Sequence, residues 1–518
     1  MVDGVQWADR ELSVLVTLYL FGNRSTRILS WEGTAMRMLA IGILLFVGSA
    51  SGLCGQTVSA ADRARFAVTP RAERRVLVTT DIGADPDDTM SLIRFLSYSN
   101  ELDVEGIVAT TSVHQKDRVA PELIKEVLEA YNKVRPNLML HEAGYPTFAS
   151  LSLKVKAGLP VYGMEGVGEG KDSPGSDLIV KVLEKADDRP LWVSVWGGPG
   201  TLAQALWKIQ HTKSAEETSR LVRKLRVYTT SDQDDSGPWM RKTFPDLFYI
   251  VSPGGNYMTS TWIGITFPAP GSNAEVVSRA WLAKNIQQGH GPMGALYPDI
   301  AYGMEGDTPT FLSLIPNGLS DPEHPDQGNW GGRYELYVPK PQPPRTTARV
   351  GDNGIDPGAE TRAIWTNAED TVTGVDGKEY KSAQATVWRW REDFQNDFAA
   401  RMCWMTKSYK ECNHPPIAVL KTPEKLSVHE GESFYLDASG SSDPDGDSLS
   451  YLWFVYPEAG TYRGTLSLGF APNLKRLKVT APHVDRPETL HFVLKVTDKG
   501  TPPLTRYRRV VVEVQPKP

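Results

Sequence analysis

Between residues 74 and 251 the chain alternates short apolar runs with amphipathic segments. The apolar runs, rich in β-branched residues, cover 74–80, 104–111, 191–196, 225–230 and 247–251. Such runs predict buried parallel strands. The amphipathic segments between them cover 90–98, 121–132 and 201–209 and predict helices. Strands that alternate with helices predict an α/β domain with a mainly parallel sheet flanked by helices.

From about residue 315 to 385 the chain becomes rich in Gly, Pro and Asp, as in Lys340–Pro344. This composition fits long loops that cover a site, and it also fits a flexible linker. The aromatic segment Trp388–Arg391 then begins a predicted helix that runs to about Met405. A helix at this point favours loops that return to the same domain.

A second pattern follows the predicted linker Asn413–Pro416. Alternating strands are expected at 433–437, 450–455, 489–496 and 507–514. About a hundred residues of this kind predict an immunoglobulin-like β-sandwich. The stretch 437–447 resembles PKD and cadherin-like modules, and its acids are either calcium ligands or turn formers. The predicted domains are therefore 61–412 and 413–518.

The N-terminus has the pattern of a targeting segment. Arg37 precedes the apolar run 38–47, and small residues follow up to Ala60. Residues 1–60 are therefore predicted to be a signal peptide with an upstream extension. Alternatively, Met36 or Met38 is the true start of translation. An uncleaved anchor at Leu12–Phe21 is a further alternative. We expect a secreted or periplasmic protein that is not transmembrane after processing.

Composition narrows the picture further. A chain of 518 residues is too long for one ordinary core, and its net charge of −6 gives no sign of nucleic-acid binding. Only Cys403 and Cys412 remain after cleavage near Ala61. In an exported protein these two cysteines are expected to form a disulfide, and two free thiols are the alternative. The cysteine spacing excludes a structural zinc site.

The acidic loop after the first strand carries the clearest chemistry. Asp81, Asp85, Asp87 and Asp88 fall within eight residues, and Glu101 lies farther on. Carboxylates at this spacing repel one another, so their charge must be offset. A helix N-terminus explains one or two of them. Four oxygen donors after a buried strand favour a divalent cation, with Ca2+ as the expected ion.

The segment Val78–Asp88 resembles the N-terminal motif of the nucleoside hydrolases. More closely, the chain is similar to the Sde182-type cellulose-binding family, which joins a nucleoside-hydrolase-like domain to a small C-terminal β domain. The resemblance covers nearly all of 70–518, with support from the segments 91–100, 231–239, 305–312 and 330–335. It implies a nucleoside-hydrolase-like α/β fold.

The resemblance also implies a set of metal ligands. Asp81 stands at the position of the first metal aspartate, which is also the proposed general base. Asp87 and Asp88 match the paired aspartates, although the longer loop makes Asp85 an alternative. The backbone carbonyl of Trp196, before a glycine turn, and the late Asp307 complete the implied set.

Other positions depart from the nucleoside hydrolases. Gly306 stands where a histidine often precedes the late aspartate and acts as the candidate acid for the leaving group. The remaining candidates for that acid are Asp232, Asp234, Asp235, His290 and Glu305. The predicted substrate-binding residues are Asp232, Asp234, Asp235, Asn256, Trp239 and Trp330. These two tryptophans, and also Trp262 and Trp388, could stack on sugar rings. A core position is the ordinary alternative for each tryptophan.

Two functions are consistent with these residues. The first is an exported metal-dependent hydrolase that acts on glycosyl or N-ribosyl bonds of a carbohydrate or nucleoside-like small molecule. The second is a non-catalytic protein that binds cellulose or another carbohydrate and is built on a nucleoside-hydrolase fold. The missing histidine at position 306 favours the second function, and the acidic loop with Asp307 favours the first.

Overall fold

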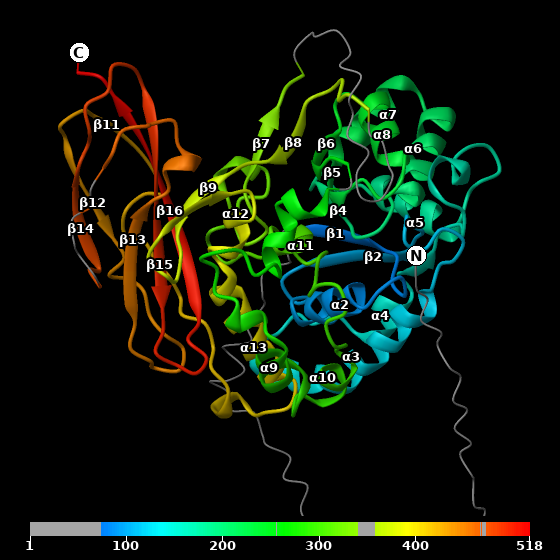
Figure 1. Ribbon diagram of the computed structural model, residues 1–518, viewed down its shortest axis with the longest axis horizontal. Helices are drawn as coiled ribbons and strands as arrows, with labels where there is room; N and C mark the ends of the chain where they lie inside the picture. Colours follow the sequence, from blue (N-terminus) through cyan, green and yellow to red (C-terminus); the bar gives the residue numbers. More distant parts are fainter. Residues whose placement is uncertain (1–73, 255, 340–357, 467, 469–472, 518) are drawn as a thin grey trace, which may run out of the picture. The chain divides into compact units, whose positions relative to one another are not determined.

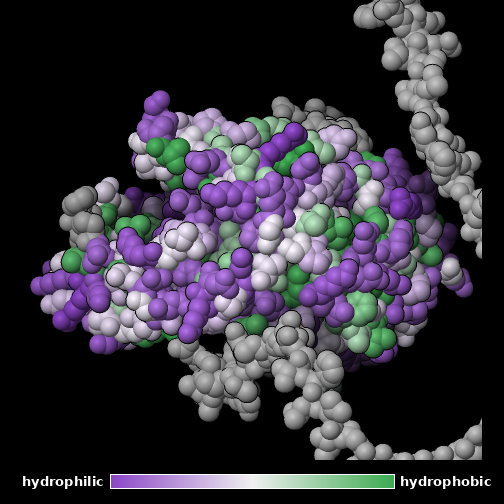
Figure 2. All heavy atoms as spheres, turned by 90° about the horizontal axis from the view of Figure 1, so that it is seen from below, coloured by the Kyte–Doolittle hydropathy of each residue, from purple (hydrophilic) through white to green (hydrophobic). Residues whose placement is uncertain are grey.

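The computed structural model describes residues 74–254, 256–339, 358–466, 468 and 473–517 (Figure 1). The predicted signal peptide of residues 1–60 and the segment Lys340–Pro344 lie outside the described residues. None of the helices in the described part of the chain combines the length and hydropathy that a membrane span requires. On the face shown in Figure 2, hydrophilic residues predominate and hydrophobic residues are scattered among them.

An eight-stranded sheet forms the α/β part of the molecule, in the order β3-β2-β1-β4-β5-β6-β8-β7. The strands are β1 (Arg75–Thr80), β2 (Asp103–Ala109), β3 (Val155–Ala157), β4 (Leu191–Val195), β5 (Leu225–Ser231), β6 (Phe248–Ser252), β7 (Tyr334–Tyr337) and β8 (Ile364–Asn367). All neighbours are parallel except β7 and β8, which are antiparallel. The predicted mainly parallel sheet is confirmed.

The helices of this part are α2 (Asp87–Ser97), α3 (Pro121–His141), α4 (Phe148–Ser152), α5 (Pro174–Leu183), α6 (Gly200–Thr212), α7 (Ala215–Lys224), α8 (Ser236–Thr243), α9 (Arg279–Leu282), α10 (Gly291–Leu296), α11 (Pro309–Leu312), α12 (Ala385–Trp388) and α13 (Arg391–Trp404). Successive side chains of a strand point to opposite faces of the sheet. Accordingly, Val76 and Val78 pack into one apolar cluster with α2, α3 and α13, and Leu77 packs into a second with α5 and α6. Burial on both faces explains why the centre of β1, Val76 to Val78, is apolar.

The Gly- and Pro-rich region contributes to the same sheet. β8 pairs with β6 through Ile250 and Trp365, and β7 pairs with β8. A two-stranded sheet of β9 (Asp370–Thr373) and β10 (Glu379–Ser382) follows. The described residues of this region therefore form loops and strands of the α/β part, not a linker.

The C-terminal part contains a four-stranded sheet, β11-β16-β15-β13, and a two-stranded sheet, β12-β14. The strands are β11 (Lys425–His429), β12 (Ser433–Asp437), β13 (Ser450–Val455), β14 (Arg476–Thr480), β15 (Glu488–Thr497) and β16 (Thr505–Gln515). Both sheets contribute to one apolar cluster, including Leu436, Leu477 and Phe492. Two β-sheets are thus present, and the immunoglobulin-like arrangement stays a prediction.

Buried ion pairs join β15 and β16 to α13. Lys495 Nζ lies 2.6 Å from Asp393 Oδ1, and Arg506 lies 2.6 Å from Asp397 Oδ2. The hydroxyl of Tyr507 also donates to Asp393. Asp397 also pairs with Arg401 of α13 at 3.2 Å, but separating the C-terminal sheets from α13 would leave the buried charge of Asp393 without its lysine.

Candidate metal centre

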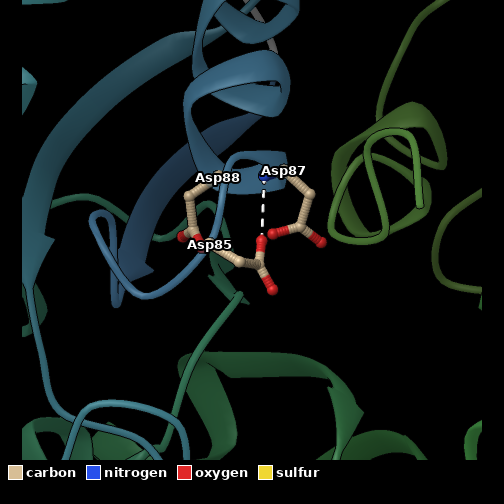
Figure 3. A group of neighbouring side chains, drawn as sticks. All are labelled: Asp85, Asp87 and Asp88. Carbon is tan, nitrogen blue, oxygen red and sulfur yellow. Dashed lines mark hydrogen bonds between the residues drawn. The ribbon is translucent and has the colours of Figure 1, made fainter. Parts of the chain in front are cut away.

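The acidic loop lies at the carboxyl end of β1, between β1 and α2, where α/β sheets typically bind ligands. Asp85, Asp87 and Asp88 each place a carboxylate oxygen within 4.8 Å of the others (Figure 3). The backbone N–H of Asp87 donates to Asp85 Oδ1 at 3.0 Å, and the hydroxyl of Thr80 donates to Asp88. The first turn of α2 therefore directs these carboxylates toward a common region.

Asp307 reaches the same region from the residues just before α11. Its carboxylate is buried, and the charges of Asp87, Asp88 and Asp81, after burial itself, raise its pKa well above the ordinary value. Its backbone carbonyl accepts hydrogen bonds from the N–H and the hydroxyl of Thr310. Its Oδ2 atom, in contrast, is buried without a hydrogen-bond partner among the described residues. We call Asp81, Asp85, Asp87, Asp88 and Asp307 the acidic centre.

Negative charge accumulates in the acidic centre. Burial, followed by the neighbouring carboxylates, raises the pKa of Asp87 and Asp88 well above the ordinary value. Burial also raises the pKa of Asp81, although a hydrogen bond with Ser112 and the nearby His114 act in the opposite direction. Among the described residues, no lysine or arginine pairs with these five carboxylates. The donors therefore fit a divalent cation, which is the offset that remains.

The glycine turn after β4 packs directly against the acidic centre. A Cβ atom on Gly197 would lie 2.7 Å from Asp81 Oδ1, so only glycine leaves room for the carboxylate. The carbonyl of Trp196 accepts a hydrogen bond from Gln233 Nε2 at 2.7 Å. One of its two acceptor positions is therefore occupied. The Oε1 atom of Gln233 is buried without a partner among the described residues, and no sequence motif singles this residue out.

Gly306 has a packing reason for being glycine. A Cβ atom there would lie 2.9 Å from Asp87 Oδ2 and 2.9 Å from the ring of Trp262. A histidine at this position would have to displace one of the two. The indole of Trp262 thus borders the acidic centre beside the backbone where nucleoside hydrolases often carry an acid.

The second acidic run, after β5, has other partners. Asp232 is buried and bonds Arg241 at 2.7 and 3.1 Å. Asp234 accepts from the N–H of Gly200 at 3.2 Å and of Ser236 at 2.8 Å, and burial raises its pKa to about 7. Asp235 accepts from the N–H of Met164 at 2.8 Å. Asp232 and Asp234 therefore hold the surrounding loops in place, and the exposed Asp235 stays a candidate contact.

The other acid candidates are also engaged elsewhere. Glu305 is fully buried, pairs with Arg94 at 2.5 Å and accepts from the Tyr297 hydroxyl at 2.6 Å. His290 lies at the start of α10, and burial lowers its pKa. Glu101 pairs with Arg401 and does not join the acidic centre.

The structure places the predicted tryptophans in the core or at its edge. Trp330 is fully buried, with its Nε1 3.3 Å from the Tyr507 hydroxyl, so it has no face to offer a sugar. Trp239 on α8 is half-buried and packs edge-on against Phe244. Asn256 is exposed, and its carbonyl accepts from the Ser260 hydroxyl at 3.0 Å. Trp330 is therefore a packing residue, Trp239 packs against the apolar cluster around α5 and α6, and Asn256 stays a candidate contact.

Sequence reasoning named Trp262 as a stacking candidate but did not relate it to the other rings beside the acidic centre. His114 Nε2 lies 3.2 Å from the Tyr257 hydroxyl, and the rings of Tyr257 and Trp262 are 5.4 Å apart. These residues come from the loops after β2 and β6, and no spacing in the sequence relates them. Proximity in the fold is the only signal that joins them.

The two cysteines bond in the structure. The S–S distance between Cys403 and Cys412 is 2.12 Å, with the Cα atoms 6.0 Å apart. The bond ties the end of α13 to the residues just before Asn413.

Comparison with known proteins decides the family. The model of the nucleoside-hydrolase-like domain of the cellulose-binding protein Sde182 matches residues 75–334, and the model of the C-terminal domain of the cellulose-binding protein Sde0182 matches residues 433–514. The chain belongs to the Sde182 family. Its α/β part is thus the nucleoside-hydrolase-like domain of that family, as the acidic loop predicted.

A solved structure agrees with the assignment to the Sde182 family. A nucleoside hydrolase-related protein from Saccharophagus degradans, described as associated with carbohydrate metabolism, is 37% identical, with a TM-score of 0.73 over 85% of this chain and 100% of that chain. The type III effector XopQ, solved with adenosine diphosphate ribose, is 12% identical over 67% of this chain and 99% of that chain. Its TM-score of 0.28 is too low to support any conclusion. No curated protein matches the chain significantly.

Proposed function

We propose that this Sde182-family protein binds carbohydrate through a divalent cation, Ca2+, at the acidic centre. The observation that carries the proposal is Asp307. It brings a buried carboxylate oxygen without a hydrogen-bond partner to four carboxylates more than two hundred residues earlier in the chain. Ca2+ takes six to eight oxygen ligands, mostly from carboxylates, backbone carbonyls and waters.

The ligands would come from Asp81, Asp87, Asp88 and Asp307, with Asp85 beside them and the Trp196 carbonyl through its second acceptor position. A bound cation supplies positive charge to sugar hydroxyls and lowers the pKa of a bound water. The chain's own contribution is a buried, preorganised set of donors, because Gly197 and Gly306 let the backbone approach the carboxylates closely.

Binding without hydrolysis is favoured by the state of the acid candidates. Cleavage of a glycosidic bond requires an acid for the leaving group or a leaving group that is already good. Asp232 and Glu305 are held by arginines, and Asp234 is held by backbone N–H groups. None of these three carboxyls is free to protonate a leaving group.

Hydrolysis of a glycosyl or N-ribosyl bond is the second candidate function, and His114 favours it. This imidazole is exposed and lies close enough to Asp81 for its charge to lower the carboxyl pKa. Asp81 would accept the proton of the attacking water, and His114 would donate a proton to the leaving group. Both groups belong to the loops at the carboxyl ends of β1 and β2.

Export follows from the same proposal. Cellulose and related glycans are found outside the cytoplasm, and the Cys403–Cys412 bond suits an oxidising compartment. We therefore propose that the protein is secreted or periplasmic and that its partner is a carbohydrate.

Affinity electrophoresis in gels with soluble glucans, and co-sedimentation with insoluble cellulose, test the proposed binding. Both are run with added Ca2+ and with EDTA, on the wild type and on Asp307→Asn. Asp246→Asn is the matched control, because Asp246 forms an exposed pair with Arg223. We expect retention by at least one of these two glycan forms that needs Ca2+ and is lost in Asp307→Asn only. Retention that is unchanged by EDTA and by Asp307→Asn would refute the role of the cation.

The hydrolase candidate has its own test. Activated aryl glycosides and nucleosides are incubated with the wild type, Asp81→Ala and His114→Ala. Turnover by the wild type that both substitutions abolish would support hydrolysis. A wild type that turns over none of these compounds in Ca2+ would leave binding as the function.

A further inference from the structure

The acidic centre has an aromatic neighbour that the proposed cation site does not use. A Cβ atom on Gly306 would lie 2.9 Å both from Asp87 Oδ2 and from the six-membered ring of Trp262. The carboxylate and the indole are therefore next to each other. The indole is half-buried, so part of it stays open to solvent.

The indole is held in a fixed orientation. Its Nε1 donates to the Ser231 hydroxyl at the end of β5, at 3.0 Å. The ring of Tyr257 packs against it at a centroid distance of 5.4 Å and an interplanar angle of 65°. With its polar atom satisfied and its plane fixed, Trp262 is preorganised to offer an apolar surface at little entropic cost.

The aromatic contacts continue away from Trp262. The His114 ring lies 6.2 Å from the Tyr257 ring at an angle of 56°, and their polar atoms are 3.2 Å apart. We call Trp262, Tyr257 and His114 the aromatic wall.

The angles between these rings limit what the wall can bind. A flat crystalline glucan surface requires rings that lie in one plane, and interplanar angles of 65° and 56° do not provide one. A curved set of rings fits a single sugar chain, whose pyranose residues carry an apolar face and equatorial hydroxyls. The neighbouring acidic centre would bind these hydroxyls.

The C-terminal sheets offer no comparable surface among their described residues. Their exposed large apolar side chains are Ile417, Val419, Tyr435, Leu452 and Leu474. Tyr435 is the one aromatic ring of that set, and the guanidinium of Arg476 covers it at 3.9 Å. In the described part of these sheets the ring face needed for a sugar is therefore already occupied.

We propose that the aromatic wall binds one pyranose residue of a soluble β-glucan chain, stacked on Trp262, with its hydroxyls directed at the acidic centre. This assignment rests on the proposed carbohydrate-binding function and adds the location and the class of ligand. It predicts recognition of free oligosaccharide chains, not of the crystalline polymer surface.

Isothermal titration with cellohexaose tests the assignment, on the full chain in Ca2+. Trp262→Ala is expected to weaken binding roughly tenfold, which is the size of one lost aromatic contact. Trp262→Phe keeps a ring and is expected to weaken it less. Trp239→Ala is the matched control, since Trp239 is also half-buried but packs against Phe244. Unfolding temperatures of all variants show whether each one is folded.

The outcomes separate this inference from the proposed function. Weaker binding in Trp262→Ala, with Trp262→Phe intermediate and Trp239→Ala unchanged, supports the wall. Wild-type binding of cellohexaose that Trp262→Ala leaves unchanged overturns the wall and leaves carbohydrate binding in place. Binding to insoluble cellulose alone also overturns the wall. A wild type that binds neither form refutes the proposed function, and the wall with it.

Discussion

Two acidic runs follow parallel strands of the same sheet, but only one of them has partners that offset its charge. After β1, Asp87 and Asp88 lie among other carboxylates without a basic partner in the described part of the chain. After β5, Asp232 has Arg241, and Asp234 has the N–H groups of Gly200 and Ser236. Acids at a strand end therefore indicate a ligand site only when the chain leaves them unpaired.

The largest expected effect comes from the paired run. Asp232→Ala would remove two hydrogen bonds from the almost fully buried Arg241 and leave it only the pair with Glu360 among the described residues. Loss of one partner of a buried ion pair typically costs about 3–5 kcal/mol of unfolding free energy. Urea denaturation measures it, with Asp246→Ala as the control on the surface. If the two variants proved equally stable, Asp232 would not be structural.

A pH effect of somewhat smaller size is expected from Asp234. Its pKa is about 7 in the folded chain, against an ordinary value of 3.8, because it is buried. The folded state therefore binds the proton more tightly, and the associated stability is complete below about pH 4 and lost as the pH rises through 7. The loss is about 4 kcal/mol at most.

Asp234→Asn should remove that dependence. Unfolding free energy measured at several pH values between 4 and 8 is expected to fall less steeply with pH in the variant than in the wild type. Parallel curves for the two proteins would show that Asp234 titrates normally and is not held as the structure describes.

The smallest effect concerns the unpaired run without its cation. In EDTA, Asp307→Asn removes one charge from a cluster of buried carboxylates and should raise the unfolding free energy by on the order of 1 kcal/mol. Thermal unfolding with and without Ca2+ measures it. The sign of the stability difference between variant and wild type should depend on Ca2+, because Ca2+ should stabilise the wild type but not the variant. A variant that is less stable than the wild type in EDTA would contradict the repulsion described.

Much of the sheet could be predicted because its central strands are apolar on both faces. β1, β2, β4, β5 and β6 all appear as apolar runs, each within about two residues of its observed bounds. β3 has only three residues and gives no such pattern. β8 lies in a Gly- and Pro-rich region and pairs with β6 through a single residue pair.

The same distinction between local and distant signals applies to the candidate site. The acidic loop is local in sequence, so its density of carboxylates was visible, and Asp307 followed from the family resemblance. What could not be foreseen depends on partners far along the chain. Examples are the pairing of Glu305 with Arg94 and the hydrogen bond of Gln233 to the Trp196 carbonyl.

Calorimetric titration of Ca2+ into the EDTA-treated chain near neutral pH tests the central claim most directly. The wild type should bind Ca2+ at one strong site. Asp307→Asn should weaken it by more than the roughly 10–100-fold typical of losing an outer-sphere partner, and Asp232→Asn, if folded, should bind like the wild type. Equal binding by wild type and Asp307→Asn, or no binding by the wild type, would contradict the acidic centre as a cation site.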